Sequence, residues 1–192
     1  FKWELVFPDK VNVGDIKQHV TEEEFLKEYN IIEQPSIFDK VAKDYPAQLT
    51  NEKGDPKYKW DNVMTILKDI NTRELHFVRL PLNHIIIDFD LKDGDEKSLM
   101  KNIIASLGFP PTYTELSKSG KGVHLHYIYD GAVSQLETQV SDGIEIKVFK
   151  GKSALRRKLT KCNDLEIAHI SSGLPLREET NSMYKDIEVI QL

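Results

Sequence analysis

The most constraining feature of this chain is an apolar segment that ends in two carboxylates. Within residues 82–90, positions 85–87 are three isoleucines, and Asp88 and Asp90 follow. β-Branched residues favour strands, and side chains alternate across a strand, so the segment predicts a strand with both acids on one face. Two such carboxylates repel each other unless a cation neutralises them. Mg²⁺ is usually held by one or two carboxylates plus substrate phosphates, so the pair is typical of a metal-phosphate enzyme. The alternative is two solvated acids at a strand end.

A second motif is a glycine turn that leads directly into a strand. The turn at residues 117–122 contains Ser119 and Lys121 beside two glycines, and the strand after it carries His124 and His126 on one face. A histidine that leaves a glycine turn can donate a hydrogen bond to a phosphate oxygen, and Lys118 and Lys121 add positive charge nearby. The alternative is a flexible hairpin turn with two surface histidines.

A third motif supplies another carboxylate on a predicted strand at residues 143–149. Glu145 and Lys147 share one face of it, opposite the apolar side chains. A third carboxylate on a neighbouring strand would complete a two-metal site, in which two ions clamp the attacking and leaving oxygens of an in-line displacement. Taken alone, the two residues are equally consistent with a surface acid-base pair.

A basic segment follows the third motif. Residues 147–161 contain seven basic residues and no acidic one, although the whole chain has a net charge of −5. Because arginine grips phosphate in a bidentate way, Arg156 and Arg157 are candidates for a clamp on a triphosphate or on template phosphates. A solvated basic face is the alternative.

The order of these motifs resembles the archaeo-eukaryotic primase superfamily, especially the primase-polymerases of phages and plasmids. That family has an apolar strand that ends in Asp-x-Asp or Asp-x-Glu, a small-x-His segment, and a strand with a further acid. The matching segments here are residues 87–90, 122–124 and 144–145, and the resemblance covers about residues 82–160.

The resemblance implies a metal site and a nucleotide contact. Asp88, Asp90 and Glu145 would bind Mg²⁺ or Mn²⁺, and His124 would contact the phosphates of the incoming nucleotide. The third acid of this superfamily is often Asp, and Asp142 lies close to Glu145 in the sequence. We prefer Glu145 because Asp142 directly precedes a glycine and is expected in a turn.

The activity that the resemblance implies is that of a DNA primase or DNA-directed polymerase. Such an enzyme transfers nucleotides from NTP or dNTP by a two-metal mechanism in DNA replication. The expected partners are a single-stranded DNA template, a primer strand and a fused or separate helicase. We expect a monomer in the cytoplasm, which is the host cytoplasm if a phage encodes the chain.

Two other functions stay open. A phosphatase of the haloacid dehalogenase kind also begins with an apolar strand that runs into Asp-x-Asp, but it usually continues with Gly-Thr, whereas Leu91 and Lys92 follow here. It would not explain His124 or Glu145. A non-catalytic nucleic-acid binding module would explain the basic segment, but its carboxylates would repel phosphates unless metal were bound.

The element pattern predicts an α/β or α+β fold. We expect the primase-polymerase fold, in which residues 76–192 form a catalytic sheet like that of RNA-recognition motifs. Residues 1–75 would form a small N-terminal α/β subdomain, with the chemistry in the cleft between the two. Strands are predicted at 2–7, 73–80, 82–90, 112–116, 123–129, 143–149, 166–170 and 188–192, and helices at 22–29, 61–70, 95–107 and 133–140; residues 35–61 are mainly loop.

Composition excludes several other classes of protein. The chain is 40% hydrophobic and 30% charged, which is typical of a soluble globular domain. No apolar run approaches the ~18 residues that suggest a membrane span, so we expect no membrane partner. Cys162 is the one cysteine, so an internal disulfide is impossible and a structural zinc site is not expected. The chain does not begin with Met, and we expect it to be a piece of a longer protein.

Overall fold

Two mainly antiparallel sheets pack around a shared hydrophobic core in the computed structural model, which describes residues 21–178. The fold is a mixed α+β fold with few helices, which confirms the predicted fold class. The strands predicted at 2–7 and 188–192 lie outside the described residues.

The large sheet has β7 and β3 at its centre. Its strand order is β11-β7-β3-β9-β8, and β6 also pairs with β7. All of these pairs are antiparallel except β11 with β7. The strands are β3 (His84–Phe89), β6 (Thr114–Leu116), β7 (Val123–Tyr129), β8 (Gln139–Ser141), β9 (Ile144–Lys147) and β11 (Ala168–Ile170).

The small sheet combines strands that lie far apart in the sequence. Its order is β1-β2-β10, from β1 (Ala47–Leu49), β2 (His76–Val78) and β10 (Leu155–Arg157). A separate hairpin joins β4 (Lys92–Asp93) to β5 (Glu96–Lys97). The small sheet therefore takes strands from both sides of residue 75, and the division of the chain at that position stays a prediction.

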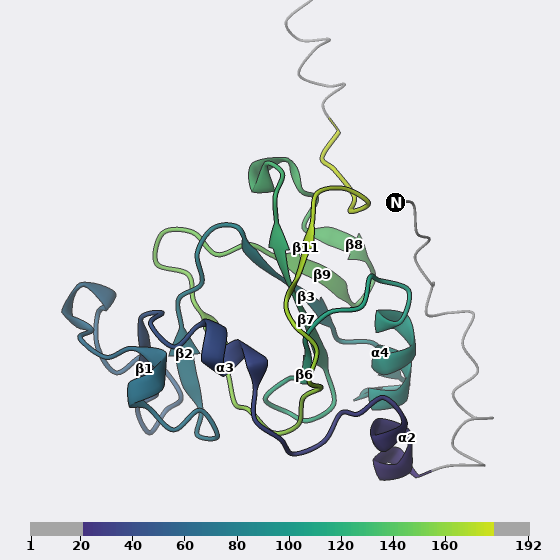
Figure 1. Ribbon diagram of the computed structural model, residues 1–192, viewed down its shortest axis with the longest axis horizontal. Coiled ribbons are helices and arrows are strands. Elements are labelled where there is room, and N and C mark those ends of the chain that lie inside the picture. The colour runs from purple at the N-terminus through teal and green to yellow at the C-terminus, as the bar shows by residue number, and fades with distance from the viewer. Residues whose placement is uncertain (1–20, 179–192) are drawn as a thin grey trace, which may run out of the picture.

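In the described part of the chain, three short α-helices pack on the sheets (Figure 1). They are α2 (Glu22–Glu28), α3 (Ile37–Val41) and α4 (Leu99–Ser106). In Figure 1, α2 and α4 lie on the side of the large sheet away from β1 and β2. The helix α3 lies between the small sheet and the large sheet. None of the helices within residues 21–178 has the length and apolar character needed to cross a membrane.

The central strand β3 is buried on both faces, which explains its unbroken apolar run. Ile85, Ile87 and Phe89 belong to the core under α2 and α4. Ile86 points the other way, into the core that the large sheet shares with α3 and the small sheet. Because alternate residues enter opposite cores, Asp88 lies on the face that looks toward the small sheet.

Several elements follow the sequence closely. The predicted strand at 123–129 is β7, and the apolar strand at 82–90 contains β3. The helix predicted at 22–29 is α2, and Thr21 closes the expected capping box with Glu24.

The prediction of a helix at residues 61–70 is wrong. The segment forms two 3₁₀ turns, η2 (Trp60–Asn62) and η3 (Leu67–Asp69). Its backbone pairs with the chain around Tyr45 instead of with itself: Leu67 N donates to Tyr45 O at 2.9 Å, and Ala47 N donates to Thr65 O at 3.2 Å. These tertiary hydrogen bonds override the helical spacing of the apolar residues.

Two other predicted helices are shorter than expected. Gly94 has a φ of 67° and turns the chain into the β4–β5 hairpin, so the helix predicted from 95 begins only at Leu99. The segment predicted as a helix at 133–140 contains one 3₁₀ turn, η4 (Val133–Gln135), and then β8. The predicted loop at 35–61 contains α3 and β1 as well as turns.

A buried ion pair joins the two sheets. Arg157 of β10 and Glu115 of β6 are each 1% exposed, and Arg157 Nε lies 3.0 and 2.9 Å from the two carboxylate oxygens. Arg157 Nη1 lies 2.8 Å from Asp39 Oδ1 on α3. One guanidinium therefore connects the small sheet, the large sheet and α3.

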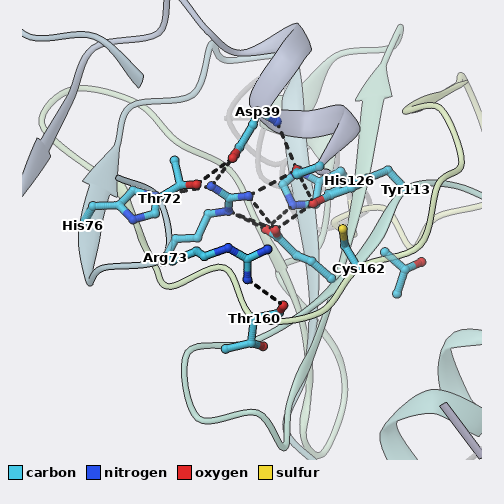
Figure 2. Close-up of polar contacts among 12 residues, drawn as sticks. Asp39, Thr72, Arg73, His76, Tyr113, His126, Thr160 and Cys162 are labelled. Carbon is cyan, nitrogen blue, oxygen red and sulfur yellow. Dashed lines mark hydrogen bonds and ion pairs between the residues drawn. The ribbon is translucent and has the colours of Figure 1, made fainter. Parts of the chain in front are cut away.

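Neutral donors complete the shell of Glu115. Tyr113 donates its hydroxyl to Glu115 Oε2 at 2.9 Å, and His126 Nε2 lies 2.8 Å from Oε1. A carboxylate only accepts, so His126 carries its proton on Nε2, and its Nδ1 accepts from His84 Nε2 at 2.9 Å. Figure 2 shows Asp39, Tyr113 and His126 pointing toward this common centre.

Burial and the contacts within this network together determine which of its side chains are charged. Burial alone would raise the pKa of Glu115, but Arg157 and His126 hold that pKa well below its usual range. Burial lowers the pKa values of His84 and His126, and burial beside Arg157 lowers the pKa of His76 to about 4. The carboxylate is thus charged and the three histidines are neutral at pH 7.

Loss of Arg157 alone should lower the free energy of unfolding more than loss of both Arg157 and Glu115. We expect Arg157→Met to lower the free energy of unfolding by about 3–5 kcal/mol, because it leaves Glu115 charged and buried without its main partner. The double variant Glu115→Gln with Arg157→Met should recover part of that loss. Urea denaturation measures both. An Arg157→Met variant within about 1 kcal/mol of the wild type would mean that the pair behaves like a surface salt bridge.

Stability should also fall in mildly acidic solution. A folded-state pKa of about 4 for His76, against 6.5 unfolded, stabilises the fold fully above pH 6.5, and this contribution is lost as the pH falls toward 4. The loss from His76 alone should reach about 2–3 kcal/mol at pH 4. Urea denaturation at several pH values should give a shallower pH dependence for His76→Gln.

The matched control for this pH dependence is His169→Asn. His169 is exposed on β11, so this variant should keep the wild-type slope. Equal slopes for His76→Gln and the wild type would contradict a neutral buried His76.

Candidate functional site

Five of the predicted site residues line one pocket of about 300 Å³. They are Asp88, Asp90, His124, Lys147 and Arg156. Asp88, His124 and Lys147 come from the large sheet, and Arg156 comes from the small sheet. Phe149 and Leu155, which belong to the core between the sheets, close the pocket beside them. The pocket therefore lies where the two sheets meet.

A row of polar residues crosses three neighbouring strands at this pocket. The register pairs Asp88 of β3 with His124 of β7 on one side and with Glu145 of β9 on the other. Side chains of directly opposed residues on one face have Cβ atoms about 4.5–5.5 Å apart. The alternation predicted from the sequence thus brings these three residues side by side.

Asp88 is buried between two basic groups. Its carboxylate oxygens lie 3.1 Å from His124 Nε2 and 3.1 Å from Lys147 Nζ, and its side chain is 6% exposed. Burial by itself raises the pKa of Asp88, but the contacts with His124 and Lys147 outweigh it and hold that pKa well below its usual range. Asp88 is therefore ionised throughout the physiological pH range.

Asp90 lies at the end of β3 and is more open. Its side chain is 40% exposed, and Oδ1 lies 2.9 Å from Lys97 Nζ on β5. Its backbone N–H donates to Gly143 O at 2.7 Å, which fixes the strand end against the start of β9. Each of the two pocket carboxylates thus has a lysine as its counter-ion.

Asn102 holds together the two loops that carry the site. It is fully buried on α4; Oδ1 accepts from Leu91 N at 2.7 Å and Nδ2 donates to Lys121 O at 2.9 Å. One amide thus fixes the chain just after Asp90 and just before Gly122. The relative position of the two motifs depends on this side chain.

Gly122 permits the close approach of these motifs. A Cβ at this position would lie 2.7 Å from Ser117 Oγ and 3.0 Å from Asp90 Oδ1. A glycine is therefore needed before the histidine strand, because Ser117 Oγ and the Asp90 carboxylate occupy the space of a side chain.

The pocket suits a hard cation in its donor chemistry. Asp88 and Asp90 provide carboxylate oxygens in one pocket, and Asp88 Oδ1 is buried without a well-directed hydrogen bond from the described residues. Mg²⁺ needs only one or two protein carboxylates when phosphates complete its shell. Within residues 21–178, no three His, Cys, Asp or Glu side chains converge as a ready-made metal cluster. The residues fit a cation that binds together with a phosphate ligand.

Four predicted site residues lie outside the pocket lining. Glu145 is exposed on β9 opposite Asp88, and Ser119 is exposed in the turn. Lys121 Nζ lies 2.9 Å from Glu22 on α2. Arg157 belongs to the buried network that joins the sheets, where Glu115 and Asp39 occupy its guanidinium, so it forms part of the core beside the pocket.

Two polar residues of the pocket, Lys97 and Ser117, were not predicted as site residues from the sequence. Lys97 falls in a segment with helical spacing, and only the Asp93-Gly94 turn could have indicated the hairpin that carries it. Ser117 and Lys118 lie in the predicted turn and line the pocket in place of Ser119. The alternative acid Asp142 lies in the turn before β9, as expected.

Comparison with protein-family models finds no match for this chain, and a search of curated proteins finds no match either. Any function proposed for the chain therefore has to rest on the chemistry of its own residues.

Filling the space at Gly122 should disturb the Asp90 carboxylate. We expect Gly122→Ala to lower the free energy of unfolding by about 1–3 kcal/mol, because the new methyl group overpacks the turn. Adding Ser117→Ala removes the nearest atom and should recover part of the loss. Thermal unfolding of the single and double variants measures this. If Gly122→Ala left the free energy of unfolding unchanged, the turn and β3 would have room for a methyl group, which would contradict the close packing at Gly122.

Proposed function

We propose that this chain is the catalytic domain of a DNA primase-polymerase that transfers nucleotides from NTP or dNTP onto a strand paired with a template. The observation that carries the proposal is the row of His124, Asp88 and Glu145 across three paired strands, with Asp90 at the end of the central one. On this proposal the large sheet is the RNA-recognition-motif-like catalytic sheet of that superfamily.

The charges around the pocket support a nucleoside triphosphate as the ligand. Lys97, Lys118, Lys147 and Arg156 line it together with two carboxylates. Four cations exceed what two carboxylates neutralise, and the surplus suits an anionic ligand. His124 Nδ1 is buried without a hydrogen-bond partner among the described residues, which leaves this ring nitrogen available to a polar group of a ligand.

The carboxylates would hold the divalent cations. Asp88 and Asp90 are the two acids within the pocket, and Glu145 is the adjacent acid on β9. Bound Mg²⁺ or Mn²⁺ supplies activation of the attacking 3′-hydroxyl and neutralisation of the leaving pyrophosphate. Lys97 and Lys147, which neutralise the carboxylates here, are then free to hold phosphate oxygens in place.

Substitution of the pocket acids should abolish incorporation. We expect Asp88→Asn and Asp90→Asn each to slow nucleotide incorporation by more than about 100-fold, because removal of one transition-state interaction in an active site costs about 2.7 kcal/mol or more. Labelled NTPs or dNTPs with Mg²⁺ or Mn²⁺ on single-stranded DNA, with and without a primer, measure this. Circular dichroism checks that the variants fold.

The acid on β9 has a matched control in the adjacent turn. Glu145→Gln should also reduce incorporation, whereas Asp142→Asn, which changes an exposed acid three residues earlier, should not. Full activity of both pocket variants would overturn the proposal. Hydrolysis of p-nitrophenyl phosphate without any incorporation would favour the phosphatase instead.

A further inference from the structure

A second hollow adjoins the candidate pocket. It has a volume of about 330 Å³ and is lined chiefly by Arg79, Leu82, Phe149 and Lys150. Phe149 lines both hollows, so the two are neighbours. Among residues 21–178, no acidic side chain lines the second hollow, in contrast to the carboxylates of the first.

The wall of this hollow is fixed by contacts at Arg79. Arg79 follows β2, and its Nη2 donates to Gly151 O in the basic turn after β9. Its Cζ lies 5.6 Å from the centroid of the Trp60 ring on η2, as a cation–π contact. The guanidinium therefore connects the turn beside the pocket to a partly exposed tryptophan.

The segment that carries Trp60 is also held in place. Gln48, which is 3% exposed on β1, accepts from Tyr58 N at 2.8 Å and donates to Tyr58 O at 3.0 Å. The backbone of Tyr58 is thus pinned by a buried amide, while its side chain is 58% exposed. Lys57 and Lys59 flank this tyrosine, so basic and aromatic residues alternate up to Trp60.

Cations, apolar side chains and aromatic rings along one path suit a single-stranded nucleic acid. Arg79 and Lys150 can neutralise phosphates, and Trp60 offers a ring on which a base can stack. A duplex keeps its base faces stacked internally and gains nothing from such a ring. The charge and the exposed aromatic side chain together favour a single strand over a duplex.

We propose that this hollow and Trp60 form a groove for single-stranded DNA that leads to the pocket of Asp88 and Asp90. That the strand is a template rests on the proposed function, whereas the binding itself does not. The groove lies on the small sheet and the turn after β9, so the small sheet would guide the strand while the large sheet carries the pocket.

Tryptophan fluorescence tests the contact directly. The chain has two tryptophans, so Trp3→Phe leaves Trp60 as the sole reporter. Titration with oligo(dT) of about 12 nucleotides, in EDTA and without nucleotide, should quench this fluorescence as bases stack on the ring. A duplex of the same length should bind at least about tenfold more weakly.

Charge variants test the path of the phosphates. Lys150→Glu and Arg79→Ala should each weaken binding of the single strand about tenfold and flatten the slope of log affinity against log salt by about 0.7 per lost contact. Arg79→Lys keeps the charge and should lose less. Lys27→Glu changes an exposed lysine on α2, across the large sheet, and should leave affinity and slope unchanged.

The outcomes separate this inference from the proposed function. Unchanged Trp60 fluorescence, or wild-type affinity of both Lys150→Glu and Arg79→Ala, would overturn the groove even if the chain incorporates nucleotides. Quenching and weakened variants without any incorporation would support the groove while the polymerase assignment fails. Equal binding of duplex and single strand would overturn the choice of ligand.

Discussion

The ion pair between Arg157 and Glu115 is the interaction on which the arrangement of the two sheets depends. It spans from the small sheet to the large one, and Asp39 binds the same guanidinium from α3. Both partners are buried, so separation of the sheets would leave the Glu115 carboxylate without its main positive partner. The candidate pocket lies at the same junction, because Arg156 is the neighbour of Arg157 on β10 and Glu115 is the register partner of His124. This buried contact thus fixes where Arg156 lies relative to Asp88 and His124.

The polar residues on the face of the large sheet toward the small sheet lie in two different environments. His126 and His84 point into the closed core, where burial keeps both rings neutral and hydrogen bonds bind them to Glu115 and to each other. His124, one step along the same strand face, reaches the pocket and contacts Asp88 instead. Two histidines on the same face of one strand therefore have different environments, because Phe38 of α3 packs against the ring of His126 whereas His124 lines the pocket.

The site could be predicted from the sequence where it depends on strand alternation alone. The period of two predicted which residues of each strand share a face, and the register then brings Asp88, His124 and Glu145 into a row. The role of Arg157 could not be predicted, because a run of seven basic residues gives no indication of which side chain turns into the core. Asn102 was equally hidden within an apolar helical stripe, since its role depends on two loops that are distant in the sequence. The α+β class followed from the elements, whereas the helix expected at 61–70 failed because its backbone pairs with residues 43–47.

The central claim is that Asp88 and Asp90 form the cation and triphosphate site of a nucleotidyltransferase. The most direct measurement is a crystal structure with Mn²⁺ and a non-hydrolysable nucleoside triphosphate, in which anomalous scattering locates the metal. The account predicts an anomalous peak in coordination contact with Asp88 and Asp90, and triphosphate oxygens near Lys147 and His124. A triphosphate or Mn²⁺ bound elsewhere, with Lys97 and Lys147 still paired to the two carboxylates, would contradict it.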